Sequence, residues 1–305
     1  MSDGKSRPIT LTRVESRLRT IYCPYTDQEI NEGETSKEHI IPLSLGGVNG
    51  FDIPVNSVFN SQVGSSLDGA LANEFLVSFR RTRYNARGHS GKEPVATVKK
   101  ATYGDGRLAH VHFHQKKGLR VWDVRERKLK QVTGPVRVET TVSVDLPIRF
   151  TAKVALGAGY YVYEHLFRKY VDHRQLRDVM NIDPAILQVS KSRSSLGLEH
   201  LTLRVDGYFS EPSSGILRVV RELCSAVNGS VVVLMLGDGC LGVAVGILGQ
   251  YVGMVNVPAN TVSFPNQGDY RWGHVVTIVR GEVWRSSWRG TLVAWEKRLR
   301  EARDD

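Results

Sequence analysis

The sequence predicts a mixed α+β fold that is divided into more than one folded unit. A chain of 305 residues is long for one compact domain, so two domains are the better expectation. Hydrophobic residues make up 41% of the chain, which is enough to build cores and argues against wholesale disorder. Strand-like apolar runs and helix-like apolar spacings both occur along the chain, and together they favour the α+β class.

A first unit is expected to end near residue 88. Residues 1–20 are polar and basic and suggest an arm or a short helix. Two short runs, 21–23 and 39–42, are typical of strands, with a turn-rich segment between them and a Leu-Gly-Gly loop after them. From 56 to about 83, apolar residues recur at three- and four-residue steps, which predicts an amphipathic helix with an interruption near Gly64.

The rest of the chain alternates between strand-like and helix-like segments. A linker at 85–94 precedes strands over 95–146, which are joined by Gly-rich turns, and a helical segment over 150–181. A basic boundary at 191–197 is followed by a strand, a helix at 215–228, two or three strands and a basic helix at 290–305. We therefore expect three regions: 1–88, a strand-rich then helical middle region 95–190, and a C-terminal α+β region 198–305.

Charge and cysteine content narrow the class of partner and the compartment. The net charge of +10 favours a polyanionic partner, with nucleic acid as the first candidate. A membrane partner is not expected, because no basic amphipathic helix, lipidation motif or long uninterrupted apolar segment is convincing. Cys23, Cys224 and Cys240 lie far apart and form no CxxC pair, which fits a reducing cytoplasm. The N-terminus has no apolar core of a secretory signal.

The segment 23–69 carries the residues best suited to phosphodiester hydrolysis. That reaction needs a base to take a proton from water and a cation to neutralise charge on the phosphate. Glu38 and His39 are adjacent at the end of a predicted strand, where a bend would be needed to bring both side chains to one phosphate. Gly46 and Gly47 provide a loop that can pass close to a ligand. Asn60, on the following helix, offers a hard neutral oxygen for Mg²⁺ or Mn²⁺.

These residues resemble the motif of the HNH (ββα-metal) endonucleases. The run EHIIPLSLGG is followed by N-x-x-x-N-x-x-x-G-S-x-x-D, and the resemblance covers roughly residues 21–80. The resemblance implies that His39 is the general base and that Glu38 and Asn60 are metal ligands, with Asn56 as the rival to Asn60. Asn56 also begins the predicted helix, where its side chain suits an N-cap. The family's middle Asn, which braces the loop, could be Asn49 or Asn56.

The chain departs from many HNH relatives in lacking two CxxC pairs that hold a structural zinc. Thr26 stands where the first pair would have its second Cys, and Asn56 and Phe59 stand at the second pair. No structural zinc is therefore expected. We expect Phe59 and Tyr25 to pack where the metal lies in those relatives.

The resemblance implies an N-terminal HNH nuclease unit followed by a mixed α+β region. The expected activity is endonucleolytic hydrolysis of DNA, most naturally double-stranded DNA, with one catalytic Mg²⁺ or Mn²⁺ ion. Residues 95–305 would choose the substrate or respond to a signal. Restriction or defence against foreign DNA is the preferred setting, and a mobile-element role is comparable. The alternative is a non-catalytic DNA- or nucleotide-sensing module, and homo-oligomer formation stays open.

Further basic residues are candidates for contact with nucleic acid. They lie near the end of the first unit, in the helical segment around 153, and in a C-terminal tail in which Trp and Arg residues alternate along the sequence. For the lysine at 153, a solvated side chain is the default interpretation. The candidates are Arg80, Arg81, Arg83, Lys153, Arg285 and Arg289.

Two other patterns are set aside. The imidazoles of His110, His112 and His114 share one face of a predicted strand, but no nearby Cys or acidic residue supports a zinc site, so a solvated or DNA-facing surface is the better interpretation. A G-x-G-x-x-G spacing at 237–242 is followed by a poor helix, and a β-hairpin explains it better than a dinucleotide site.

Overall fold

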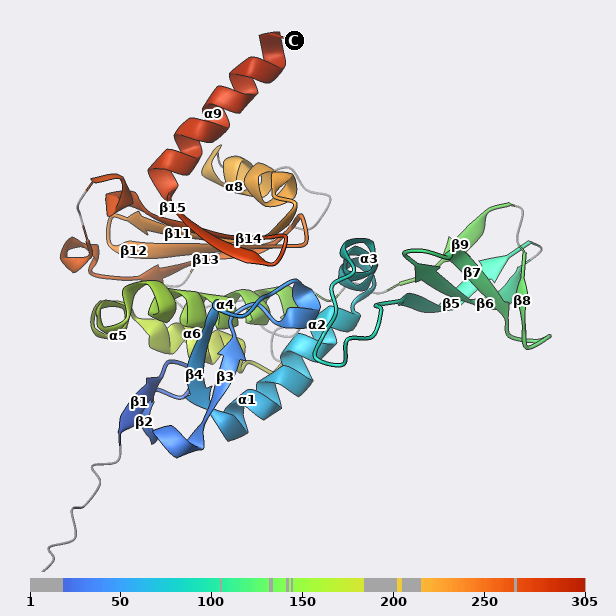
Figure 1. The fold of residues 1–305 in the computed structure, drawn as a ribbon, viewed down its shortest axis with the longest axis horizontal. Coiled ribbons are helices and arrows are strands. Elements are labelled where there is room, and N and C mark those ends of the chain that lie inside the picture. Colours follow the sequence, from blue (N-terminus) through green and yellow to red (C-terminus); the bar gives the residue numbers. More distant parts are fainter. Residues whose placement is uncertain are drawn as a thin grey trace, which may run out of the picture.

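The computed structural model describes residues 19–104, 106–131, 134–140, 143, 145–183, 202–204, 215–265 and 268–304. Residues 1–18 of the arm or short helix expected over 1–20 lie outside the described residues, as does the boundary expected at 191–197. The described chain contains helices and strands throughout, which confirms the α+β class (Figure 1).

The first unit contains two small antiparallel strand pairs followed by a broken helix. The elements are β1 (Thr20–Cys23), β2 (Gln28–Asn31), β3 (Thr35–His39), β4 (Asp52–Asn56), α1 (Ser57–Val63), a π-helical segment (Gly64–Asp68), α2 (Gly69–Asn73) and α3 (Phe75–Tyr84). β1 pairs with β2, and β3 pairs with β4. The interruption expected near Gly64 is confirmed, since the helix widens into the π-helical segment there.

The strand expected at 39–42 is wrong, because β3 ends at His39. β3 has the polar sequence Thr-Ser-Lys-Glu-His, which lacks the β-branched and aromatic residues that mark strands in a sequence. Its partner β4 was also missed, since Pro54 within it argues against a strand. Pro54 is tolerated because this is a two-stranded sheet in which each strand has a free edge.

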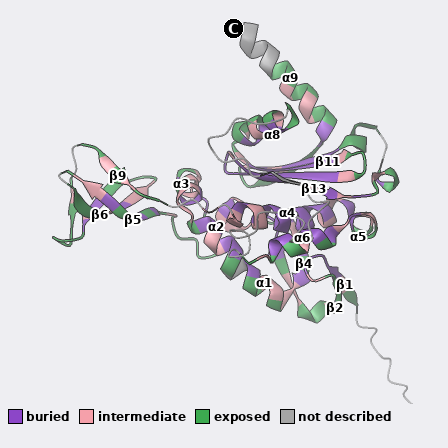
Figure 2. Ribbon diagram, turned by 180° about the vertical axis from the view of Figure 1, so that it is seen from behind, coloured by how far each residue is buried: buried purple, intermediate pink, exposed green. Residues whose placement is uncertain are grey.

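A layer of helices lies at the centre of the molecule. It consists of α4 (Asp145–Tyr163), α5 (His165–Tyr170) and α6 (His173–Met180), which confirms a helical segment over 150–181. Most of α4 is buried around its whole circumference, as Figure 2 shows. A helix that is apolar on all sides needs cover on all sides. One side of α4 approaches the first unit so closely that a Cβ at Gly157 would lie 2.7 Å from the Tyr25 hydroxyl.

A six-stranded antiparallel sheet covers the other side of this layer, in the order β10-β13-β12-β11-β14-β15. In β11, Val232 and Leu234 join the core that includes α4, while Val231 and Val233 join a second core with α8. Both faces of the sheet are thus covered (Figure 1). Its elements are α8 (Gly215–Ala226), β10 (Thr202–Arg204), β11 (Gly229–Gly237), β12 (Cys240–Ile247), β13 (Gln250–Pro258), β14 (Gly273–Val279), β15 (Glu282–Ser287) and α9 (Trp288–Asp304).

The predicted hairpin and the tryptophans of the basic tail can both be located in this C-terminal region. Gly237 pairs with Cys240 across a tight turn, which confirms the expected hairpin. In the tail, Trp288 is buried in the core with α8, whereas Trp272 and Trp284 are about half exposed. Some tryptophans of the tail therefore pack in the core, whereas others lie at the surface.

A separate five-stranded antiparallel sheet projects from the body (Figure 1). Its strand order is β8-β7-β6-β5-β9, and it has a small core of its own around Ala109, Val111 and Val121. The strands are β5 (Ala96–Tyr103), β6 (Arg107–His114), β7 (Gly118–Asp123), β8 (Lys128–Lys130) and β9 (Val136–Val138).

The packing differs from the three regions expected from the sequence. The middle region 95–190 separates into the projecting sheet and the helical layer. The helical layer shares one hydrophobic core with the first unit and with the six-stranded sheet. The physical reason is α4, whose apolar surface is buried by elements from both ends of the chain. None of the helices in the described ranges has the length and apolar character needed to cross a membrane.

Candidate active site

Glu38 and His39 lie at the end of β3, where the chain turns sharply. The bend expected at the end of this strand lies at Ile40 and Ile41, which are fully buried and anchor the turn in the core. Glu38 and His39 are 7% and 9% exposed. Both line a cleft of about 360 Å³, to which Asn60 and Asp68 also contribute.

The imidazole of His39 is held by its Nε2 atom, which lies 2.9 Å from Asn49 Oδ1. With the amide oxygen as acceptor, Nε2 carries the proton and Nδ1 is left as the basic nitrogen. The loop residue that braces His39 is therefore Asn49, which the sequence left open between two positions. The exposed His89 stands beside His39 with the ring centroids 5.7 Å apart.

Glu38 is held by a buried lysine. The Lys153 ammonium, on α4, is fully buried and forms ion pairs with Glu38 Oε1 and, at 2.6 Å, with Asp68 Oδ2. Asp68 ends the π-helical segment and is itself 6% exposed. One cation thus joins three elements that are far apart in the sequence, and the cluster has a net charge of −1 when both carboxyls are ionised.

Burial and charge shift the pKa values of this cluster in opposite directions. Burial raises the pKa of the Asp68 carboxyl to about 6, although the adjacent Lys153 ammonium limits the rise. Burial alone would lower the pKa of Lys153, but Asp68 and Glu38 outweigh it and the pKa lies above its ordinary value. Burial and the same two carboxylates raise the pKa of the Tyr25 hydroxyl well above 10.0, so Tyr25 is an uncharged neighbour of the cluster.

The two asparagines of the helix have different roles. Asn56 Oδ1 accepts a hydrogen bond of 2.9 Å from the Phe59 backbone N–H, which caps the start of α1 as its sequence position suggested. Asn60 Nδ2 donates to Ser36 Oγ at 2.9 Å and to the Lys37 carbonyl at 3.3 Å. Because its amide nitrogen is used in this way, the Asn60 Oδ1 atom is the one left to bind a ligand.

Aromatic packing helps to hold the side of the site where α1 begins. The rings of Tyr25 and Phe59 stack with centroids 5.7 Å apart, which confirms the expected contact. Cys23 is buried and free, and its sulfur accepts from the Asn56 backbone N–H at 3.4 Å. The fold of the loop requires glycine at position 47, whether or not a ligand binds, because a Cβ there would lie 1.6 Å from the Ile41 carbonyl oxygen.

The donor atoms at the cleft fit a small divalent cation. Lys153 forms its ion pair with the Oε1 atom of Glu38, so the Oε2 atom is left for a ligand. Asn60 contributes its amide oxygen, and Asp68 Oδ1 is buried without a hydrogen-bond partner. These are the hard oxygen ligands that Mg²⁺ and Mn²⁺ prefer. In the described parts of the chain, no cluster of three or more His, Cys, Asp or Glu could by itself hold a metal. A cation here would use the amide oxygen of Asn60 and water as well.

The structure corrects two of the six candidates for nucleic-acid contact. Lys153 is wrong, because its buried ammonium is enclosed by carboxylates and cannot reach a phosphate. The guanidinium of Arg81 is used inside the protein, where it donates to the carbonyls of Ser44 at 2.6 Å and Ala72 at 2.9 Å. Arg83, Arg285 and Arg289 are exposed and Arg80 is half-buried, so they stay candidates.

Sequence reasoning missed the roles of Asp68 and His89. Asp68 is part of the quoted pattern but had no assigned role, since only the fold places it against Lys153. His89 belongs to a segment that has the composition of a linker, and nothing in the sequence signals that this linker passes beside His39.

Asp68→Asn should flatten the pH dependence of stability in metal-free buffer. The folded-state pKa of Asp68, about 6, lies above the unfolded value near 3.8, so the folded protein binds more protons between these values. Its contribution to stability is therefore complete below pH 3.8 and is lost as the pH rises through about 6. Urea unfolding across this window should show wild type losing more stability with rising pH than Asp68→Asn. Parallel curves for the two proteins would contradict the raised pKa.

Comparison with protein-family models, with curated proteins and with solved structures gives no match. The resemblance to HNH endonucleases accordingly rests on the residues of this chain themselves.

Proposed function

We propose that the protein is a metal-dependent endonuclease of the HNH type that hydrolyses phosphodiester bonds of double-stranded DNA. The observation that carries the proposal is the pairing of a braced His39 with Glu38 at one cleft. His39 has Nε2 held by Asn49 and Nδ1 available, and Glu38 and Asn60 offer oxygen atoms beside it. The proposed setting is defence against foreign DNA in the cytoplasm.

His39 is the general base of the proposed reaction. Its Nδ1 atom takes a proton from the attacking water, and the hydrogen bond from Nε2 to Asn49 holds the ring in the orientation and tautomer that this requires. A bound Mg²⁺ or Mn²⁺ would neutralise charge on the phosphate and on the leaving oxygen. Glu38 and Asn60 would hold this ion, and Lys153 keeps Glu38 in place through the opposite carboxylate oxygen.

A binding module without catalytic activity is the rival proposal, and one observation favours it. Glu38 is already paired with a buried ammonium, and a carboxylate neutralised in this way is a weaker ligand for a cation. Metal-dependent cleavage distinguishes the two proposals, because a binding module would bind DNA without cutting it.

His39→Ala should abolish nicking of supercoiled plasmid DNA while leaving the fold intact. Loss of a general base costs roughly 10²–10⁴-fold in rate. Wild type should nick with Mg²⁺ or Mn²⁺, stop when a chelator is added, keep its melting temperature, and resume when metal is restored. His165→Ala is the matched control, since His165 is exposed at the start of α5 and should not affect the rate. A His39→Ala protein that nicks at the wild-type rate would exclude His39 as the base.

Asn60→Ala and Asn56→Ala should separate metal binding from helix capping. Asn60→Ala should lose cleavage, because the amide oxygen that Asn60 contributes to the cleft is gone. Asn56→Ala should retain measurable cleavage but lose about 1 kcal/mol of stability, as the loss of an N-cap does. Nicking rates and urea unfolding of both proteins test this. An active Asn60→Ala together with a stable but inactive Asn56→Ala would move the ligand assignment to Asn56.

A further inference from the structure

The positive charge of the chain is concentrated in the projecting sheet. Between residues 96 and 138 there are 11 Lys and Arg against three Asp and Glu, so this segment holds +8 of the net charge of +10. The rest of the chain is therefore close to neutral. A charge excess confined to one small sheet is typical of a surface that meets a polyanion.

Strand register places a set of cationic and ring-bearing side chains on one face of this sheet. In β6 and β7, His112 lies opposite Arg120 and His110 lies opposite Trp122, and directly opposite residues share a face. Thr102 of β5 lies opposite both Arg137 of β9 and Leu108 of β6, so these three residues share one face. Leu108 is two residues before His110 in the same strand, and Arg137 therefore lies on the face of His110. We call this set the histidine face: His110, His112, Arg120, Trp122 and Arg137.

The acidic residues described in this sheet do not neutralise the histidine face. Asp123 follows Trp122 in β7 and so points to the opposite face, where it is buried and accepts a hydrogen bond from Tyr103. Glu126 lies in the turn after β7 and is engaged by Arg107, Lys128 and Lys130. Arg120 and Arg137 are exposed and have no ion-pair partner among the described residues. Their charge is available to an outside partner.

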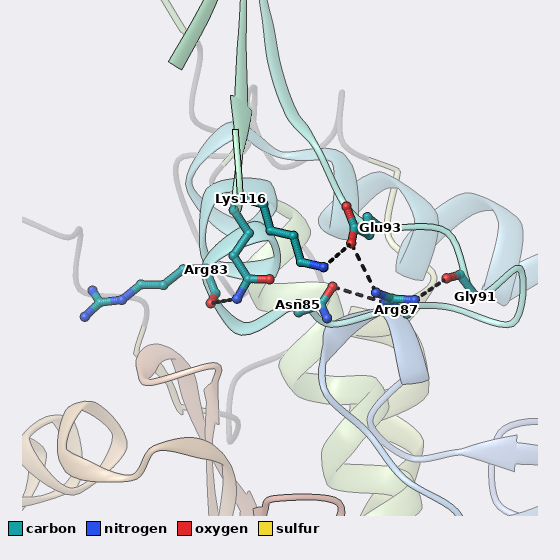
Figure 3. A network of polar contacts seen from close by, with 7 residues as sticks. Arg83, Asn85, Arg87, Gly91, Glu93 and Lys116 are labelled. Carbon is teal, nitrogen blue, oxygen red and sulfur yellow. Dashed lines mark hydrogen bonds and ion pairs between the residues drawn. The ribbon is translucent and has the colours of Figure 1, made fainter. Parts of the chain in front are cut away.

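The base of the sheet is fastened beside the candidate active site. Glu93 bridges Arg87 and Lys116 (Figure 3), with ion-pair distances of 3.4 and 3.7 Å. The side chain of Gln115 donates to the Arg83 carbonyl at 3.1 Å. This network ties the β6–β7 turn to the end of α3 and to the segment 85–94. The same segment supplies Gly88 and His89 to the wall of the cleft.

Aromatic packing reinforces the same attachment. Phe113 of β6 contacts Phe75 and Phe79 of α3, with ring centroids 5.9 and 5.4 Å apart. The sheet is thus held by both polar and apolar contacts to the helix that precedes the segment lining the cleft. A polyanion bound on the histidine face would therefore be held by a sheet whose base lies beside the wall of the cleft.

We propose that the histidine face binds the phosphate backbone of the double-stranded DNA whose strand is cut in the cleft. The choice of DNA as the polyanion rests on the proposed function, whereas the location of the surface rests on charge and register alone. Guanidinium and imidazole N–H groups donate to phosphate oxygens, and such contacts position a duplex without reading its sequence. Binding is consequently salt-dependent, because each neutralised phosphate releases counterions.

The test measures binding of a short fluorescent DNA duplex by anisotropy, with all proteins in the His39→Ala background so that nothing is cut. Arg120→Glu/Arg137→Glu should weaken binding roughly tenfold or more, and the slope of log K against log salt should become shallower by about two between about 50 and 200 mM salt. The matched control is Arg218→Glu/Arg298→Glu, which reverses two exposed charges on α8 and α9 and should bind as the parent does. Thermal melts establish that each protein is folded.

The outcomes test the docking surface and the proposed endonuclease separately. Unchanged affinity of the Arg120→Glu/Arg137→Glu protein, or an equal loss in the control pair, overturns the histidine face as the docking surface. If Arg120→Glu/Arg137→Glu weakens binding but the protein with His39 intact never nicks plasmid DNA, the docking surface stands and the proposed endonuclease fails. If nicking occurs and the two arginines have no effect on binding, the endonuclease stands and the docking surface fails.

Discussion

The buried ammonium of Lys153 is the interaction on which the rest of the site depends. Placing one cation in the middle of an apolar helix is costly, and the cost is offset only if its partners are present and well placed. Here the partners are Glu38 at the end of β3 and Asp68 at the end of the π-helical segment. Because the Lys153 ammonium is buried, both carboxylates must lie against it, and this contact fixes the position of β3 and of the π-helical segment relative to α4. The six-stranded sheet then completes the cover of α4, and its Ser230 hydroxyl donates to the Leu45 carbonyl in the loop beside the cleft at 3.3 Å.

Local signals in the sequence predicted much of the fold. Apolar spacing predicted the helical segment over 150–181, and the break near Gly64 was visible as well. Strands β3 and β4 were not predicted correctly, because β3 is polar and β4 contains Pro54, so neither has the composition of a strand. The division into regions failed for a different reason. Local patterns describe how one segment folds, whereas the shared core around α4 is formed by segments from both ends of the chain.

The candidate site shows the same limit at the level of single residues. Glu38, His39 and Asn60 could be chosen from their chemistry and from the resemblance to the HNH motif, and the structure brings them to one cleft. Asn56 could be predicted as a helix cap, because capping depends only on neighbours in the sequence. Lys153 was interpreted as solvated, since an isolated lysine in a helix gives no sign of a buried partner 85 positions earlier in the chain. Partners of that kind become visible only when the packing is known.

The free energy of unfolding of Lys153→Met, measured in urea at neutral pH, tests the central claim most directly. If Lys153 holds the site together, its removal leaves two carboxylates buried without a cation, and stability should fall by about 3–5 kcal/mol. A triple variant, Glu38→Gln/Asp68→Asn/Lys153→Met, removes all three charges and should recover much of that loss, because no uncompensated charge stays buried. A Lys153→Met protein as stable as wild type would contradict the account.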